Sequence, residues 1–226
     1  MKKLFRILTF TFTREDCLTF SRKEFFLGLI TTWLVGIGRY WDHPNAELGQ
    51  YLGLGSVIYI FLLSFFIWVI VYPLRKQHWH YFQIVTFVSL VSLPAILYAI
   101  PVERFMSLEA ARKTNVWFLQ VVALWRVALL IVFLKRYAQL SIAETIVATL
   151  LPLTIIVAGL TLLNLEHAVF DIMAGIRENS GTPYDRAYFF LFALTTASIS
   201  LLPFLLAAYS FLVFRAYRIR RQIKKT

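Results

Sequence analysis

The sequence contains little charge, because only 15% of its 226 residues are Asp, Glu, Lys or Arg. Soluble domains usually contain about 25% charged residues, whereas 59% of this chain is hydrophobic. A soluble fold of this size has no interior for so many apolar side chains, so we expect lipid to surround them. Cys17 is the only cysteine, which excludes an intramolecular disulfide.

The common motifs of catalytic and cofactor sites are also absent from the sequence. It has no P-loop, no CxxC and no HExxH pattern, and no histidine lies in an apolar run where it would activate a serine. We therefore expect neither enzymatic activity nor a cofactor. The net charge of +11 does not indicate a nucleic-acid partner, since the basic residues lie at the chain ends and between apolar runs.

Six apolar runs dominate the chain. A spanning helix needs roughly 20 apolar residues, because the hydrocarbon core of a bilayer is about 30 Å thick. The runs are 25–41, 51–74, 81–102, 116–134, 142–165 and 187–214. They predict an all-α, polytopic integral membrane protein with six transmembrane helices. A single membrane domain, 25–214, then lies between a basic N-terminal segment, 1–24, and a basic tail, 215–226.

Helix-start signals precede three of these runs. Ser21 with Glu24, Ser141 with Glu144 and Thr182 with Asp185 each have the spacing of a capping box. In that motif the hydroxyl accepts from a free backbone N–H, and the acid reaches back to the cap residue. The three pairs therefore favour helices that begin at these places. At the N-terminus, Leu4, Ile7 and Leu8 predict one face of a short interfacial helix whose Lys3 and Arg6 reach lipid headgroups.

The distribution of basic residues predicts the orientation. Cytoplasmic connections carry an excess of Lys and Arg, and alternate connections are basic if both termini are cytoplasmic. The residues predicted to lie inside are Lys2, Lys3, Arg6, Arg14, Arg22, Lys23, Arg75, Lys76, Lys135, Arg136, Arg215, Arg218, Arg220, Arg221, Lys224 and Lys225. Acidic residues instead collect on the opposite side. This pattern predicts an N-in, C-in protein of the inner (cytoplasmic) cell membrane, with the lipid bilayer as its first partner.

Arg126 lies about midway along the fourth run, where a charge costs roughly 2.5–3.5 kcal/mol on insertion scales. One interpretation is that Arg126 faces a polar cavity and binds an anion, a lipid phosphate or a substrate carboxylate. The alternative is a packing role, in which Arg126 pairs with Glu144 or satisfies backbone carbonyls that prolines leave free in neighbouring helices. Arg126 and Glu144 together are the candidate binding site.

The outer connection 166–186 offers weaker candidates. His167 and Asp171 are four residues apart, the spacing of two metal ligands on one helical face, and Asp42 and His43 come from another outer connection. With no third helical ligand, we predict no metal site. Val169, Ile172, Met173 and Ile176 recur at helical spacing and suggest either a short surface helix or a longer fifth helix.

Four segments resemble the core of Yip-family membrane proteins, which has a Trp-bearing helix, a short turn ending in Leu-Ser and another helix. They are Pro94-Ala95-Ile96-Leu97-Tyr98, Leu124-Trp125-Arg126-Val127, Leu140-Ser141-Ile142-Ala143-Glu144-Thr145 and Leu150-Leu151-Pro152. The likeness covers roughly a third of the chain. It implies a non-enzymatic, scaffold-like or trafficking-associated protein, although that family usually has five spans.

Two functional hypotheses follow. The first is a non-enzymatic membrane protein that acts by helix–helix or protein–lipid association, with a second copy or another membrane protein as its partner. Close-packing residues such as Gly36, Gly38, Ala193 and Ala197 favour it. The alternative is a small transporter or channel for an anionic or lipid-like solute that uses the intramembrane Arg126 beside proline-interrupted helices.

Overall fold

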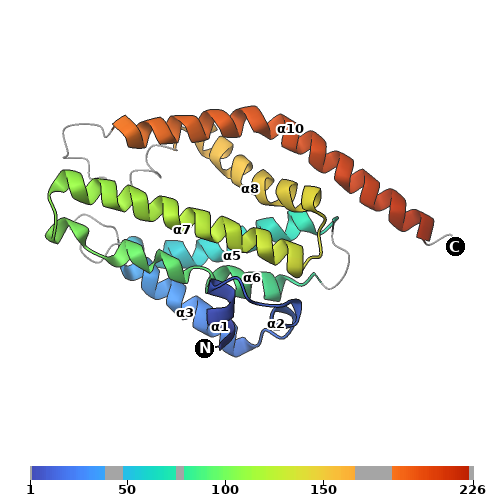
Figure 1. The fold of residues 1–226 in the computed structure, drawn as a ribbon, viewed down its shortest axis with the longest axis horizontal. Helices are drawn as coiled ribbons and strands as arrows, with labels where there is room; N and C mark the ends of the chain where they lie inside the picture. Colours follow the sequence, from blue (N-terminus) through green and yellow to red (C-terminus); the bar gives the residue numbers. More distant parts are fainter. Residues whose placement is uncertain (1, 39–47, 75–78, 166–184, 224–226) are drawn as a thin grey trace.

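The computed structural model describes residues 2–38, 48–74, 79–165 and 185–223, and these residues form an all-helical bundle (Figure 1). In chain order the elements are α1 (Lys2–Leu8), α2 (Arg14–Leu18), α3 (Arg22–Gly38), α4 (Leu48–Tyr51), α5 (Leu54–Val71), α6 (Tyr81–Leu90), the 3₁₀ helices η1 (Leu93–Ala99) and η2 (Val102–Arg104), α7 (Leu108–Arg136), α8 (Ile142–Leu162) and α10 (Asp185–Ile223). The fold class predicted from the apolar runs is confirmed at the level of an all-α protein.

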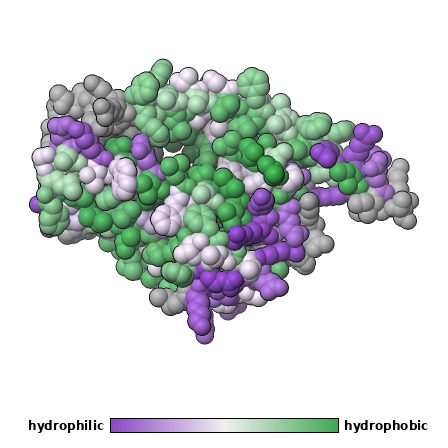
Figure 2. Space-filling view, viewed as in Figure 1, coloured by the Kyte–Doolittle hydropathy of each residue, from purple (hydrophilic) through white to green (hydrophobic). Residues whose placement is uncertain are grey.

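Within the described residues, five stretches are long and apolar enough to cross a membrane. They are Leu54–Val71, Tyr81–Ala99, Glu109–Arg136, Ile142–Leu162 and Phe189–Gln222. Each corresponds to one of the predicted runs. The remaining run, 25–41, falls on α3, which has 17 residues, and its last residues lie outside the described part of the chain. The surface agrees with a lipid environment, since Figure 2 shows apolar residues over most of the helices.

The third run is not one continuous α-helix as predicted. α6 ends at Leu90, and the chain continues as η1, which has Pro94 near its start. Proline has no N–H to donate to the carbonyl four residues before it, and it disfavours the helical conformation at the residue before it, so Pro94 favours a break after α6. Ser92 also turns its hydroxyl to the Val88 carbonyl, 3.1 Å away. The break therefore lies between α6 and Pro94.

Helix α7 is longer than the run 116–134 indicated. It begins at Leu108, where Ser107 acts as N-cap and accepts from the Ala110 N–H at 3.4 Å. The first turns carry an ion pair of Glu109 with Lys113, 2.6 Å apart. Hydropathy alone missed these turns because a helix can continue past the bilayer on polar residues.

Close packing between α3 and its neighbours depends on four glycines, Gly28, Gly36, Gly38 and Gly53, of which Gly28 and Gly53 show the reason. A Cβ on Gly28 of α3 would meet the Ser89 side chain of α6, with the Ser89 Cβ at 2.9 Å. Gly53, the N-cap of α5, has φ +65, and a Cβ there would come within 2.8 Å of both the Ile37 nitrogen and the Trp33 oxygen. Only glycine allows this backbone conformation and this approach without strain.

The last three long helices, α7, α8 and α10, alternate in direction (Figure 1). In Figure 1, α7 and α10 run the same way, and α8 runs back between them. α10 packs mainly against α8, and its C-terminal end extends past the rest of the bundle (Figure 1). The connection before it, residues 166–184, lies outside the described residues, so the predicted surface helix is not described.

Candidate functional site

Arg126, the main candidate from the sequence, lies in the middle part of α7 and is partly exposed. Its guanidinium carbon is 5.9 Å from the centre of the Tyr59 ring, which comes from α5. A cation over an aromatic face is attracted by the negative charge density of the ring, and the attraction grows where water is excluded. The aromatic partner therefore offsets part of the cost of placing this charge among apolar residues.

Glu144 serves a different purpose from the one that a pairing with Arg126 would need. Its carboxylate accepts from both the backbone N–H and the hydroxyl of Ser141, each at 2.8 Å, and the Ser141 oxygen accepts in turn from the Glu144 N–H. This is the capping box predicted at the start of α8. Among the ion pairs of the described residues none joins Arg126 to Glu144, so the structure does not bring the two candidates together.

The candidate metal ligands and the other capping boxes lie only in part within the described residues. Asp42, His43, His167 and Asp171 lie outside the described residues. In the part of the chain that the structure describes, no three His, Cys, Asp or Glu side chains come together as metal ligands. Of the three capping boxes, that of Ser21 and Glu24 is present in part, because the Ser21 N–H donates to Glu24 at 2.9 Å while its hydroxyl accepts from Lys23.

The N-terminal segment, defined as residues 2–20, forms a docked element that the sequence reading missed. Phe12 and Cys17 are fully buried (0% exposed), and the helix α1 buries Ile7 to the same extent. Lys3 and Arg6, which we expected at lipid headgroups, instead contact Glu24 at 3.5 Å and Asp16 at 2.8 Å. One feature of the sequence did indicate a helix in this segment. Thr13 and Asp16 form a capping box at the start of α2, which precedes no apolar run.

The C-terminal half of α7 provides the contact surface for this segment. Trp125 donates from its indole N–H to the Leu8 carbonyl at 3.2 Å and stacks on Phe10. Arg136 donates to the Phe10 carbonyl at 2.7 Å and also to that of Phe12. These donors satisfy carbonyls in the turn after α1, which would otherwise be left unpaired against apolar neighbours.

Aromatic rings form the interior next to this docked segment. Phe133 stacks on Phe87 with ring centres 3.9 Å apart, and it also lies beside Trp79 and Tyr137. Phe12 packs against Phe87 at 6.0 Å, so the N-terminal segment adds a ring to the cluster. Stacked and tilted pairs of this kind stabilise a core beyond their buried area.

Two ionisable groups, one in the N-terminal segment and one just after it, have shifted pKa values. Burial, followed by the nearby charge of Asp16, raises the pKa of the Cys17 thiol to about 12. For Glu24, desolvation acts to raise the pKa, but hydrogen bonds from Ser21 and the charge of Lys3 outweigh it and lower the pKa to about 2. Cys17 is therefore an unreactive, neutral thiol, and Glu24 is a carboxylate at any physiological pH.

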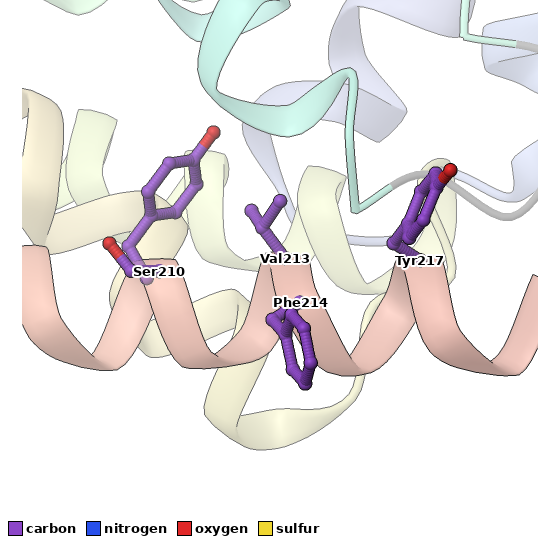
Figure 3. Close-up of a pocket in the computed structure, with 5 residues that line it drawn as sticks. Ser210, Val213, Phe214 and Tyr217 are labelled. Atoms are coloured by element: carbon purple, nitrogen blue, oxygen red, sulfur yellow. The ribbon is translucent and has the colours of Figure 1, made fainter.

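An open groove of about 420 Å³ runs along α10 near the end of α5. It is lined by Tyr209, Ser210, Val213, Phe214 and Tyr217. Figure 3 shows Val213 and Tyr217 pointing from α10 towards the end of α5, while Phe214 points away. The Tyr209 hydroxyl donates to the Ile70 carbonyl of α5 at 2.9 Å, which fixes one end of the groove against the bundle.

The membrane part of α10 is exposed around most of its circumference. In its apolar stretch only 11% of residues are buried within the protein. Leu191, Thr195 and Ser198 are buried, whereas Ala193 and Ala197 are exposed. Because an α-helix turns once every 3.6 residues, the two alanines lie on the face opposite the three buried residues.

Comparisons of this chain with protein-family models, with curated proteins and with solved structures give no match. The resemblance to Yip-family proteins therefore stays a prediction from the sequence. In the part of the chain that the structure describes, the side chains discussed above form ion pairs, helix caps, aromatic contacts and an open groove. Such contacts serve packing and binding.

Proposed function

We propose that this chain is a non-enzymatic, six-span protein of the inner cell membrane that acts by helix–helix association through α10. Both termini lie on the cytoplasmic side, and the partner of α10 is a second copy of the chain. The scaffold-like role implied by the resemblance to Yip-family proteins agrees with this proposal. The observation that carries it is the exposed apolar surface of α10.

The orientation has two supports. The basic N-terminal segment lies against the end of α7 that carries Lys135 and Arg136, so three groups of basic residues, with those of α10, gather at one end of the bundle. Figure 2 shows hydrophilic residues over the N-terminal segment and at the end of α10. Lys and Arg are retained on the cytoplasmic side. With α3 counted as a sixth crossing, both termini fall on that side.

The surface of α10 suits a second helix rather than lipid alone. Ala193 and Ala197 form a small-xxx-small pattern on the exposed face, and Phe204 follows on the same face with 72% of its surface exposed. Small residues let two helix backbones approach closely, which strengthens packing in a medium where lipid tails are as apolar as leucine. In α3 the small residue Gly28 already serves this purpose within the chain; in α10 the two alanines contact no other part of the bundle closely enough to be buried.

The test is self-association of the purified protein. Blue-native electrophoresis after mild solubilisation, together with energy transfer between labelled copies in vesicles, should show a species larger than the monomer. Ala193→Ile with Ala197→Ile should convert it to the monomer, because the larger side chains hold the backbones apart. Ala123→Ile, at an exposed position of α7, is the matched control and should behave like the parent. A parent protein that is monomeric in both measurements contradicts the proposal.

Transport of an anion by Arg126 has less support. The guanidinium faces the Tyr59 ring, and the groove described above is lined by α10 rather than by α7. Flux of an anion into vesicles that is lost in Arg126→Ala would nevertheless favour that function over association.

A further inference from the structure

We propose that the groove on α10 binds one anionic phospholipid of the cytoplasmic leaflet, with an acyl chain along the groove and the phosphate at Arg221. The inference uses the proposed cytoplasmic placement of the C-terminus but not the association of α10 with a second copy. It adds a ligand and a binding site to the proposed function.

The position of the groove corresponds to the boundary of the bilayer. Tyr209 is level with the end of α5, because its hydroxyl is bonded to the Ile70 carbonyl and α5 ends at Val71. Tyr217 follows Tyr209 by eight residues, roughly 12 Å further along the helix axis. Beyond the end of α5, the exposed rings of Phe214 and Tyr217, each 66% exposed, need an apolar or interfacial environment. Tyrosine is enriched at that depth because its ring is apolar and its hydroxyl is polar.

The residues that follow Tyr217 on α10 include basic side chains next to the apolar groove. Arg221 lies four residues after Tyr217, so it extends the groove face by one helical turn. Arg218 has the same relation to Phe214. Both arginines are exposed, and no ion pair is recorded for either among the described residues. An apolar groove that leads to free guanidinium groups matches a molecule with an apolar tail and an anionic head.

Charge complementarity selects an anionic lipid rather than a zwitterionic one. No Asp or Glu occurs after Asp185, so α10 has no acid beyond its first residue that could neutralise Arg218 and Arg221. The basic residues of this end are Arg215, Arg218, Arg220, Arg221, Lys224 and Lys225. Clusters of this size directly after a spanning helix are attracted to anionic headgroups, and arginine binds phosphate through paired N–H donors.

Two pairs of matched variants distinguish a site from general attraction to the membrane. Arg221→Gln removes a charge on the groove face, whereas Arg215→Gln removes one on the opposite face of the same helix. Tyr217→Ala removes a ring that lines the groove and points towards α5 (Figure 3), whereas Phe211→Ala removes a ring that is 64% exposed but does not line the groove. All four positions are exposed and lie within eleven residues of one another, where surface substitutions change stability little, so the two members of a pair should fold alike.

The measurement is native mass spectrometry of the solubilised full-length protein with phosphatidylglycerol or phosphatidylcholine. The parent should retain phosphatidylglycerol preferentially, and Arg221→Gln should lower that preference about fivefold, as expected for one juxtamembrane basic residue. Tyr217→Ala should weaken retention of both lipids, since both have the same tails. Arg215→Gln and Phe211→Ala should match the parent.

An equal loss in Arg215→Gln and Arg221→Gln overturns the site, because charge then acts without regard to the helix face. Equal effects of Phe211→Ala and Tyr217→Ala overturn the groove as the place of the tail. The spectrum also separates monomers from larger species, so lipid retention is read on each. A monomer that retains phosphatidylglycerol supports the lipid site even if self-association fails.

Discussion

Arg136 holds Phe12 by two contacts at once. Its guanidinium donates to the Phe12 carbonyl and lies 5.3 Å from the centre of the Phe12 ring. Phe12 is fully buried and packs against Phe87. The last residue of α7 thus joins the N-terminal segment to the aromatic interior, and the exposed charge at this helix end becomes a structural contact.

Arg136→Ala should release the N-terminal segment. Losing hydrogen bonds from a charged donor costs about 2 kcal/mol, which raises the population of the open segment roughly thirtyfold. The reporter is Cys17, the only cysteine, whose burial and raised pKa keep it from reacting while the segment is docked. Maleimide modification of Cys17 at pH 8 should therefore be slow in the parent and at least tenfold faster in the variant.

Lys135→Ala is the control for this measurement, since Lys135 is the neighbouring exposed cation and should leave the rate unchanged. Modification of parent Cys17 as fast as in protein unfolded by detergent would show that the segment is not docked.

How far the sequence predicts this structure depends on the kind of interaction. An apolar run indicates that lipid rather than water surrounds the helix, so the five apolar stretches, including α5 and α8, were recognisable from hydropathy. The Ser141–Glu144 capping box also predicted the first residue of α8 correctly. The docking of residues 2–20 was not predictable, because it depends on contacts such as Trp125 with Leu8, separated by 117 positions. Local patterns contain no information about such pairs.

The candidate site shows the same limit. The sequence identified Arg126 as a charge that needs a partner, and the candidates were an anionic ligand, backbone carbonyls freed by prolines, and Glu144 as the nearest acid. The structure supplies an aromatic ring, Tyr59, and uses Glu144 as a cap. A residue that already satisfies one strong local contact is a poor candidate for a second, and this is the physical reason why the pairing was not formed.

The stability of the N-terminal segment should depend on pH through Glu24. Since hydrogen bonds from Ser21 lower the folded-state pKa of Glu24 to about 2, its carboxylate contributes stability above about pH 4.3, its ordinary value. This contribution is lost as pH falls through about 2. The difference in melting temperature between the parent and Glu24→Gln should therefore be constant above pH 5 and should shrink towards pH 2.

Ser21→Ala tests the cause of that shift. Without the serine hydroxyl, the pKa of Glu24 returns towards its ordinary value, so the contribution should disappear at a higher pH than in the parent. A difference between parent and Glu24→Gln that does not change from pH 5 to pH 2 would be inconsistent with a lowered pKa.

Gly53→Ala should destabilise the contact between α3 and α5. The substitution places a side chain in a left-handed backbone conformation and against three backbone atoms of α3, which have no means of moving aside cheaply. We expect a loss of about 2–4 kcal/mol in the free energy of unfolding, from backbone strain and overpacking together. Gly55→Ala is the matched control, because a Cβ there meets nothing within 4 Å. It should be neutral or slightly stabilising in a helix, and equal losses in the two variants would contradict the close approach.

Arg126 provides the most discriminating prediction, since Glu144 was one partner expected from the sequence and the structure places Tyr59 beside Arg126. In double-mutant cycles on the free energy of unfolding in mixed micelles, Arg126→Met and Tyr59→Leu should show a coupling of about 0.5–2 kcal/mol, as a partly desolvated cation over a ring requires. Arg126→Met and Glu144→Gln should be additive within about 0.5 kcal/mol, because Glu144 contributes through the cap of α8 alone. Glu144→Gln should by itself cost little, because glutamine can keep the capping box, whereas Ser141→Ala should cost about 1 kcal/mol, the usual value of a lost N-cap. A coupling above 1 kcal/mol with Glu144 and none with Tyr59 would reverse the assignment, and a large coupling with both would mean that the charge is shared between α5 and α8.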